Sequence, residues 1–375
     1  MYGYESVNSK INICSFSRFF IVREIPTLGR KILLLTVSSI ITLLVAEIML
    51  QLFWTNSYEN TGADTILKLR INHHNLNLTL DRSKIDQNVP FVSVRTNSRG
   101  YIEPTIRFEP PDYTIAFLGG STTACAAVQE ELRFPALVSK LLEERGLKVN
   151  TLNAGRAGGT LHDSINILLN HVVQDHPDVI VVMHALNDTA LIRTDNYKSR
   201  MGHEVSLTDV VKYLAQLGSI HSSLIGLVRK AVITTGNISP DPDQYINRPQ
   251  TIDSEPFRAR LNIFVEMCRA FGIKPVLLTQ PFSPMIKNDL TPDWMNPTAL
   301  TAFNQVIREV VDKKNAHLVD LAAYIAEKGV TKDEVRKIFY DGIHVTDYGS
   351  RIYAIYLADR LYEILTTETT YKAKQ

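Results

Sequence analysis

Three residues that together could carry out acyl transfer lie far apart in the chain: Ser121, Asp341 and His344. Ser121 follows Gly119 and Gly120 at the end of a short apolar run, and glycines allow the backbone and a ligand to approach closely. A serine hydroxyl is a poor nucleophile at neutral pH unless an imidazole removes its proton. His344 is suited to accept that proton through Nε2, with Asp341 holding Nδ1–H so that the tautomer is correct.

The Gly-Gly-Ser turn has two other interpretations. A small-residue turn after a strand often packs a helix against a sheet, or binds a phosphate through backbone N–H groups. No lysine follows the glycines, as a P-loop requires, so the phosphate interpretation is weaker. The Asp341-Gly-Ile-His344 segment, far downstream, favours a nucleophilic Ser121.

From Tyr113 onward, strand and helix patterns alternate, which is typical of a parallel sheet covered on both faces. A final helix is expected at about Asp347–Leu365, with Thr346 as its N-cap. The predicted strands lie within 115–118, 149–153, 179–184, 275–279 and 318–321, and the predicted earlier helices near 134–142, 161–172, 257–270 and 300–311.

Polar or glycine-marked sites follow the first three strands or precede the last helix. They are Ser121, the Asn153–Thr160 segment, Asn187, and the Asp341/His344 pair. In open α/β sheets the chemistry lies at the carboxyl edge of the strands, so these sites are expected to converge there. A backbone N–H freed by glycine, together with the amide of Asn187, would hold the oxyanion.

These four blocks resemble those of the SGNH (GDSL-type) hydrolases, over about Tyr113–Leu365. The resemblance implies an α/β, flavodoxin-like three-layer α/β/α sandwich with a five-stranded parallel sheet. It also implies roles for five residues. Ser121 is the nucleophile and one oxyanion donor, Gly158 and Asn187 are the other donors, and Asp341 and His344 complete the triad. Two positions depart from the family pattern: Gly120 replaces the usual Asp, and Ala185 replaces the usual Gly.

Other reactive residue types have less specific surroundings. His184 either lines the cleft or is a hydrogen-bonded structural histidine, and Asp188 either takes part in catalysis or caps a segment. Arg156 either meets an anionic substrate or is a surface arginine. We favour the structural role for each. The same applies to the adjacent pair at 73–74, to the helix start at 162–163, and to the thiol at 125, which is expected to be small and buried.

Composition limits the function classes. The 375 residues carry a net charge of +1, which gives no reason to expect a nucleic-acid partner. The three cysteines form neither a metal pattern nor a disulfide framework. No metal and no organic cofactor is implied.

The N-terminal region predicts a membrane anchor. Residues 1–31 are polar and basic, and residues 32–54 form a largely apolar run long enough to cross a bilayer, in which Glu47 is the only charged residue. The basic flank places residues 1–31 in the cytoplasm and the catalytic domain in the periplasm or outside the cell. Glu47 is expected to snorkel or pair, or to serve as a functional carboxylate. A cleaved signal peptide and a buried helix are the alternatives.

The expected organisation continues with a spacer at 55–110 that carries a short hairpin. A hydrolase domain follows at 111–370, with an insertion at 189–255 as a lid or binding wall. The predicted function is that of a membrane-anchored SGNH-type serine esterase or lipase, which cleaves an O-acyl ester on a carbohydrate or lipid through an acyl-enzyme. The alternatives are an acyltransferase acting on a cell-surface polysaccharide, and a non-catalytic binding module on the same scaffold.

Overall fold

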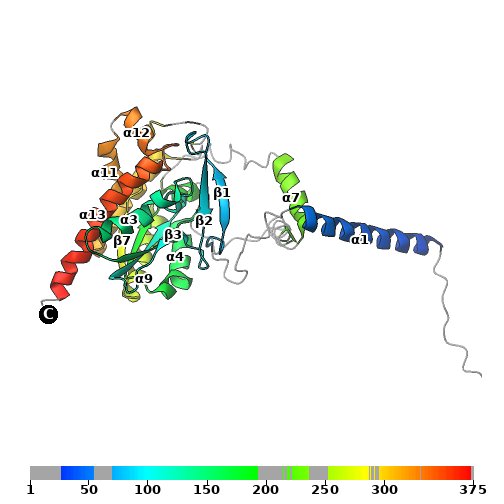
Figure 1. Ribbon diagram of the computed structural model, residues 1–375, viewed down its shortest axis with the longest axis horizontal. Coiled ribbons are helices and arrows are strands. Elements are labelled where there is room, and N and C mark those ends of the chain that lie inside the picture. Colours follow the sequence, from blue (N-terminus) through cyan, green and yellow to red (C-terminus); the bar gives the residue numbers. More distant parts are fainter. Residues whose placement is uncertain are drawn as a thin grey trace, which may run out of the picture.

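A six-stranded sheet forms the centre of the molecule (Figure 1). The computed structural model describes residues 27–54, 70–192, 214, 218–219, 222–235, 252–286, 288, 291, 295–329 and 331–372. The strand order is β3-β5-β4-β6-β7-β8. These strands are β3 (Ile102–Ile106), β4 (Tyr113–Gly119), β5 (Val149–Asn153), β6 (Val179–Met183), β7 (Lys274–Leu278) and β8 (His317–Val319).

The sheet is mixed, which corrects the prediction of a five-stranded, all-parallel sheet. Strands β5, β4, β6, β7 and β8 run parallel, whereas β3 pairs antiparallel with β5 at the edge. The sequence signal for β3 is weak because Pro104 lies in its centre, and proline lacks the N–H that a central strand needs. An edge strand tolerates it because one side of its backbone pairs with no strand.

Helices cover both faces of the sheet, and the alternation along β4 decides which residues meet which layer. Ala116 and Leu118 pack with α4 (Leu161–Asn170), α9 (Glu255–Ala270) and α10 (Pro297–Lys314). Ile115 and Phe117 pack with helices of the opposite layer. That layer comprises α3 (Phe134–Glu143), α11 (Leu321–Lys328), α12 (Lys332–Ile338) and α13 (Asp347–Lys372), and Thr346 accepts from Gly349 N–H as the predicted cap of α13.

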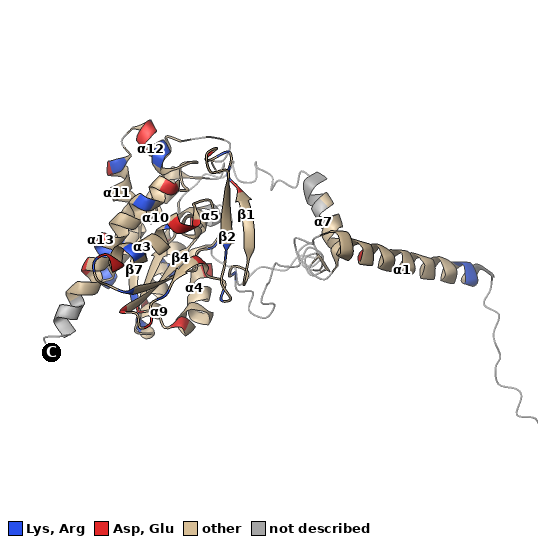
Figure 2. Cartoon of the chain, viewed as in Figure 1, with Lys and Arg blue, Asp and Glu red and all other residues tan. Residues whose placement is uncertain are grey.

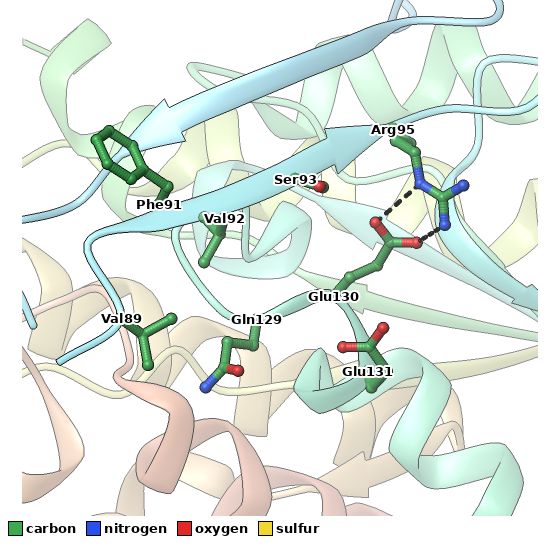
Figure 3. A pocket seen from close by; sticks show the side chains of 8 residues that line it. All are labelled: Val89, Phe91, Val92, Ser93, Arg95, Gln129, Glu130 and Glu131. Carbon is green, nitrogen blue, oxygen red and sulfur yellow. Dashed lines mark hydrogen bonds and ion pairs between the residues drawn. The ribbon is translucent and has the colours of Figure 1, made fainter.

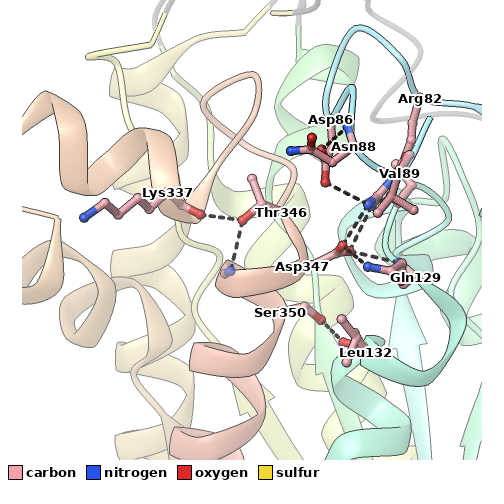
Figure 4. A network of polar contacts seen from close by, with 12 residues as sticks. Arg82, Asp86, Asn88, Val89, Gln129, Leu132, Lys337, Thr346, Asp347 and Ser350 are labelled. Carbon is pink, nitrogen blue, oxygen red and sulfur yellow. Dashed lines mark hydrogen bonds and ion pairs between the residues drawn. The ribbon is translucent and has the colours of Figure 1, made fainter.

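Two arginines fasten a separate hairpin, β1 (Asn77–Asp81) and β2 (Phe91–Arg95), to this sandwich. Arg82 is 2% exposed and donates to both carboxylate oxygens of Asp347, at 2.9 and 2.8 Å (Figure 4). Burial alone would raise the pKa of Asp347, but hydrogen bonds from Arg82 and Gln129 lower it below its ordinary value. Arg95 pairs with Glu130 of the short helix η1 (Glu130–Leu132), along one wall of a surface pocket (Figure 3).

Helix α1 (Thr27–Phe53) extends away from the sheet domain and meets α7 (Ser223–Thr235) at one end (Figure 1). Within the described residues it is the one helix long and apolar enough to cross a bilayer, and its basic residues lie at its start (Figure 2). Its Glu47 carboxylate accepts from the Ser222 hydroxyl and from the N–H groups of Ser223 and Leu224, at 2.7–2.9 Å. Most of the predicted insertion at 189–255 lies outside the described residues.

Candidate active site

The Gly-Gly-Ser turn places Ser121 at the carboxyl end of β4, as the first residue of α2 (Ser121–Ala124). Gly119 is required here: a Cβ would lie 2.0 Å from Thr123 Oγ1 and 2.8 Å from the Met183 carbonyl of the neighbouring strand. The tight strand-to-helix turn therefore depends on a missing side chain. It leaves Ser121 only partly buried, between two buried neighbours.

A loop between α12 and α13 brings the two downstream residues to Ser121. The Ser121 hydroxyl lies 2.7 Å from His344 Nε2, and His344 Nδ1 lies 2.6 Å from Asp341 Oδ2. The other oxygen of Asp341 accepts the N–H groups of Ile343 and His344, at 3.0 and 2.7 Å. With Asp341 as an acceptor, Nδ1 carries a proton and Nε2 is free to take one from the serine.

Burial differs along this chain of hydrogen bonds. The Asp341 side chain is 2% exposed, whereas the His344 side chain is 21% exposed. The ring of Tyr340 stacks on the imidazole, with centroids 5.6 Å apart and planes 13° from parallel. The carboxylate is thus fixed, and the imidazole is held by contacts on its ring face and at Nδ1. Tyr340 was not identified from the sequence, because aromatic residues beside a loop carry no distinct pattern.

The predicted oxyanion residues lie around the same turn. The Asn187 amide donates to the Gly159 carbonyl at 2.8 Å, and Asn187 belongs to α5 (Leu186–Ile192), which follows β6. Gly158 adopts φ +69°, in the left-handed region that favours glycine. A Cβ on Gly120 would lie 2.7 Å from Asn187 Nδ2. A side chain at position 120 would therefore displace the Asn187 amide in this chain.

Two residues that precede the first sequence motif brace the 153–160 loop. Arg70 Nη1 donates to the Gly158 carbonyl at 3.3 Å and to Asp163 at 3.0 Å. The Asn72 amide donates to the Gly155 carbonyl at 2.9 Å. These residues were missed because they lie far upstream of the loop in the chain and belong to no recognisable motif.

Asp188, Asp163 and His184, three of the residues interpreted as structural, make structural contacts. Asp188, fully buried, accepts from the N–H of Leu161 at the start of α4, and Asp163 forms a capping box with Thr160. His184 lies 2.7 Å from the Ser164 hydroxyl, and burial lowers its pKa to about 4. The described residues contain no cluster of three His, Cys, Asp or Glu side chains suited to a metal ion.

A small pocket opens beside the Ser121–His344 pair, lined by Ser121, His344, Tyr340, Val345 and residues 122 and 125–128. The Cys125 thiol faces this region but is 5% exposed and donates to the Thr122 carbonyl at 3.1 Å. Burial raises the pKa of Cys125 to about 12, so it carries no thiolate at neutral pH. The nucleophile available at this pocket is therefore the serine.

The model of the GDSL-like lipase/acylhydrolase family matches residues 117–352. The chain belongs to this family. It accordingly has the SGNH hydrolase α/β fold with a mixed sheet, and family membership supports esterase or acylhydrolase activity.

Solved structures are similar at low identity. An acetylxylan esterase from Geobacillus stearothermophilus is 16% identical, with 67% of this chain and 94% of that chain covered and a TM-score of 0.43. A lipase/acylhydrolase from Enterococcus faecalis is 17% identical, with 66% and 94% covered and a TM-score of 0.43. No curated protein matches the sequence.

Proposed function

We propose that this member of the GDSL-like family is a membrane-anchored serine esterase that cleaves an O-acyl group from a carbohydrate or lipid through an acyl-enzyme. The observation that carries the proposal is the continuous hydrogen-bonded chain from Ser121 through His344 to the buried Asp341. Family membership supports the reaction class. The role of each residue is our assignment.

In the first half-reaction, Ser121 Oγ attacks the ester carbonyl while His344 Nε2 takes the hydroxyl proton. The N–H groups of Ser121 and Gly158 and the Asn187 amide donate to the oxyanion. His344 then gives the proton to the departing alcohol, and the acyl group stays on Ser121. In the second half, His344 deprotonates a water that attacks the acyl carbonyl, and Ser121 leaves with the proton. Asp341 stabilises the imidazolium in both halves.

The proposal places α1 in the membrane as an uncleaved anchor, with residues 1–31 in the cytoplasm and the catalytic domain on the other side. The Glu47 contacts with α7 support this arrangement, because an intramembrane carboxylate is costly unless it is hydrogen-bonded. Location then makes cell-surface polysaccharide or lipid the substrate pool. The division into a 55–110 spacer and a 111–370 hydrolase domain with a 189–255 insertion belongs to the same proposal.

Fluorophosphonate labelling of the full chain in detergent tests the nucleophile. We expect Ser121→Ala and His344→Ala to abolish labelling. Ser164→Ala is the matched control, because Ser164 also lies 2.7 Å from a histidine. His176→Ala is the second control, since His176 is exposed and precedes β6 at the amino edge of the sheet. Retained labelling of folded Ser121→Ala protein would refute the assignment.

A p-nitrophenyl acetate assay, with and without a sugar acceptor, distinguishes hydrolysis from acyl transfer. Hydrolysis predicts free acetate as the product in both conditions. Acetylated sugar as the dominant product would replace the esterase with an acyltransferase that uses the same residues.

A further inference from the structure

A cluster of basic side chains lies along the loop that carries the proposed oxyanion donor Gly158. Arg156 belongs to that loop, and its backbone N–H donates to the Gly119 carbonyl at 3.0 Å. Its own carbonyl accepts from the Gly159 N–H at 2.9 Å. The backbone of Arg156 is therefore fixed one hydrogen bond away from the turn that presents Ser121.

The nearby carboxylate is already engaged. Asp163 pairs with Arg70 at 3.0 Å and accepts from both the N–H and the hydroxyl of Thr160, at 2.9 and 2.8 Å. The Arg156 guanidinium, by contrast, makes no hydrogen bond or ion pair with any other residue that the structure describes. Asp163 thus lies near two arginines at this edge of the site but pairs only with Arg70.

The environment of Arg156 disfavours a cation without a counter-ion. Its side chain is partly buried. Burial, and then the charge of Arg70, lower the pKa of Arg156 below its ordinary value, while Asp163 acts in the opposite direction. Burial and then the charge of Arg156 lower the pKa of His73 in the same cluster. A bound anion would relieve both effects.

We propose that Arg156 binds an anionic group of the substrate, a carboxylate or a phosphate carried near the scissile ester. The inference rests on the proposed esterase function and narrows its substrate class to acylated anionic glycans. A guanidinium is suited to this role because it meets a carboxylate or phosphate with two parallel hydrogen bonds.

Matched substrate pairs test the proposal. One pair is an O-acetylated uronic-acid disaccharide and the same compound with its carboxyl reduced to an alcohol. The other is an O-acetylated sugar phosphate and its dephosphorylated form. We expect the wild-type kcat/KM to favour the anionic member of at least one pair by about tenfold or more, as loss of a charge-assisted hydrogen bond implies. The preferred pair identifies the anion.

Arg156→Gln should bring that ratio close to one, and Arg156→Lys should keep part of it, because lysine retains the charge but not the two-pronged geometry. Arg269→Gln is the charge-matched control. Arg269 lies in the last turn of α9, just before β7 begins. It is therefore at the amino edge of the sheet, whereas Ser121 is at the carboxyl edge. The control should keep the wild-type ratio.

A binding measurement makes the test independent of turnover. Ser121→Ala protein should bind the deacetylated uronic-acid disaccharide or the sugar phosphate more tightly than the neutral counterpart, and added Arg156→Gln should remove the difference. Equal binding and equal kcat/KM within both pairs would overturn the anion site. If fluorophosphonate still labels Ser121 in that case, the esterase proposal stands without the anion site. Loss of fluorophosphonate labelling together with selective binding of the anionic ligand would refute the esterase proposal and leave the anion site standing.

Discussion

The molecule contains two serine–histidine pairs with the same hydrogen-bond length. Ser121 lies 2.7 Å from His344 Nε2, and Ser164 lies 2.7 Å from His184 Nε2. An aspartate stands near the second ring nitrogen in both cases, but at different distances. Asp341 Oδ2 is 2.6 Å from His344 Nδ1, whereas Asp188 Oδ2 is 3.7 Å from His184 Nδ1, beyond hydrogen-bond range.

Burial separates the two pairs further. The His184 side chain is 2% exposed, and Asp188 directs both oxygens at the N–H of Leu161. The His344 side chain is 21% exposed and borders the pocket beside Ser121. A short serine–histidine contact is therefore not sufficient for nucleophilic catalysis. The imidazole also needs a carboxylate aligned with Nδ1 and an open side from which substrate can approach.

The largest expected difference between the two pairs is in turnover. Ser121→Ala should lower kcat for ester hydrolysis by about 10⁶-fold, as removal of a triad nucleophile does elsewhere. Ser164→Ala should change kcat less than about tenfold while lowering stability, because it leaves the buried His184 without its hydroxyl partner. Single-turnover kinetics with p-nitrophenyl acetate measures the loss of activity in each of the two variants. Equal losses in the two variants would contradict the comparison.

The aspartates offer the next test. Asp341→Asn should lower kcat by about 10³- to 10⁴-fold, because an amide no longer selects the tautomer with a free Nε2. Asp188→Asn should act mainly on stability, by about 1–3 kcal/mol, through its bond to Leu161 N–H. Steady-state kinetics and thermal unfolding of the same samples separate the effects. A kcat loss in Asp188→Asn as large as that in Asp341→Asn would show that alignment with Nδ1 is not the deciding factor.

Much of the sandwich was predictable because its strands carry strong local signals. Strand β6 is an uninterrupted apolar run, fully buried, and its alternation with helical stripes indicates a parallel sheet. Strand β3 was missed because Pro104 weakens its local pattern, and only its pairing with β5 reveals it. Local propensity cannot report a partner that lies some 50 residues further along the chain.

For the candidate site, sequence order indicated which residues to examine but not how they meet. Ser121 and His344 were marked by glycines and by a short Asp–His spacing, and the structure places the Ser121 hydroxyl 2.7 Å from His344 Nε2. The brace from Arg70 and the stacking of Tyr340 depend on tertiary contacts alone. The partner of Glu47 was likewise hidden, because the start of α7 resembles any other helix N-terminus.

A moderate loss of kcat is expected from a substitution at Gly120, which lies next to Ser121 of the Ser121–His344 pair. Gly120→Ala would place a Cβ 2.7 Å from Asn187 Nδ2 and push the amide aside. Because loss of one oxyanion donor costs about 10²–10³ in kcat, we expect a loss of up to that size with little change in stability. The double variant with Asn187→Ala should lose no more than Asn187→Ala alone. Additive losses would place the effect of Gly120 elsewhere.

The smallest expected effect is on the pH dependence of stability, and it comes from His184 of the buried Ser164–His184 pair. Burial lowers the pKa of His184 from 6.5 to about 4. Between these pH values the imidazole is protonated in the unfolded chain but neutral in the folded protein. The unfolding free energy should therefore fall as pH drops from about 6.5 toward 4. The contribution of His184 is about 3 kcal/mol at most, from 1.36 kcal/mol per pKa unit.

Thermal unfolding of the full chain in detergent at about pH 7 and about pH 4.5 measures this dependence. His184→Gln should lose part of it, because glutamine takes up no proton, whereas a carboxylate such as Asp347 contributes equally in both proteins. An unchanged pH dependence in His184→Gln would mean that other buried groups, such as His171, are responsible. A reduced pH dependence of stability would show that His184 stays neutral at a pH where an exposed imidazole is charged. Its burial, which excludes substrate, would then also account for its protonation state.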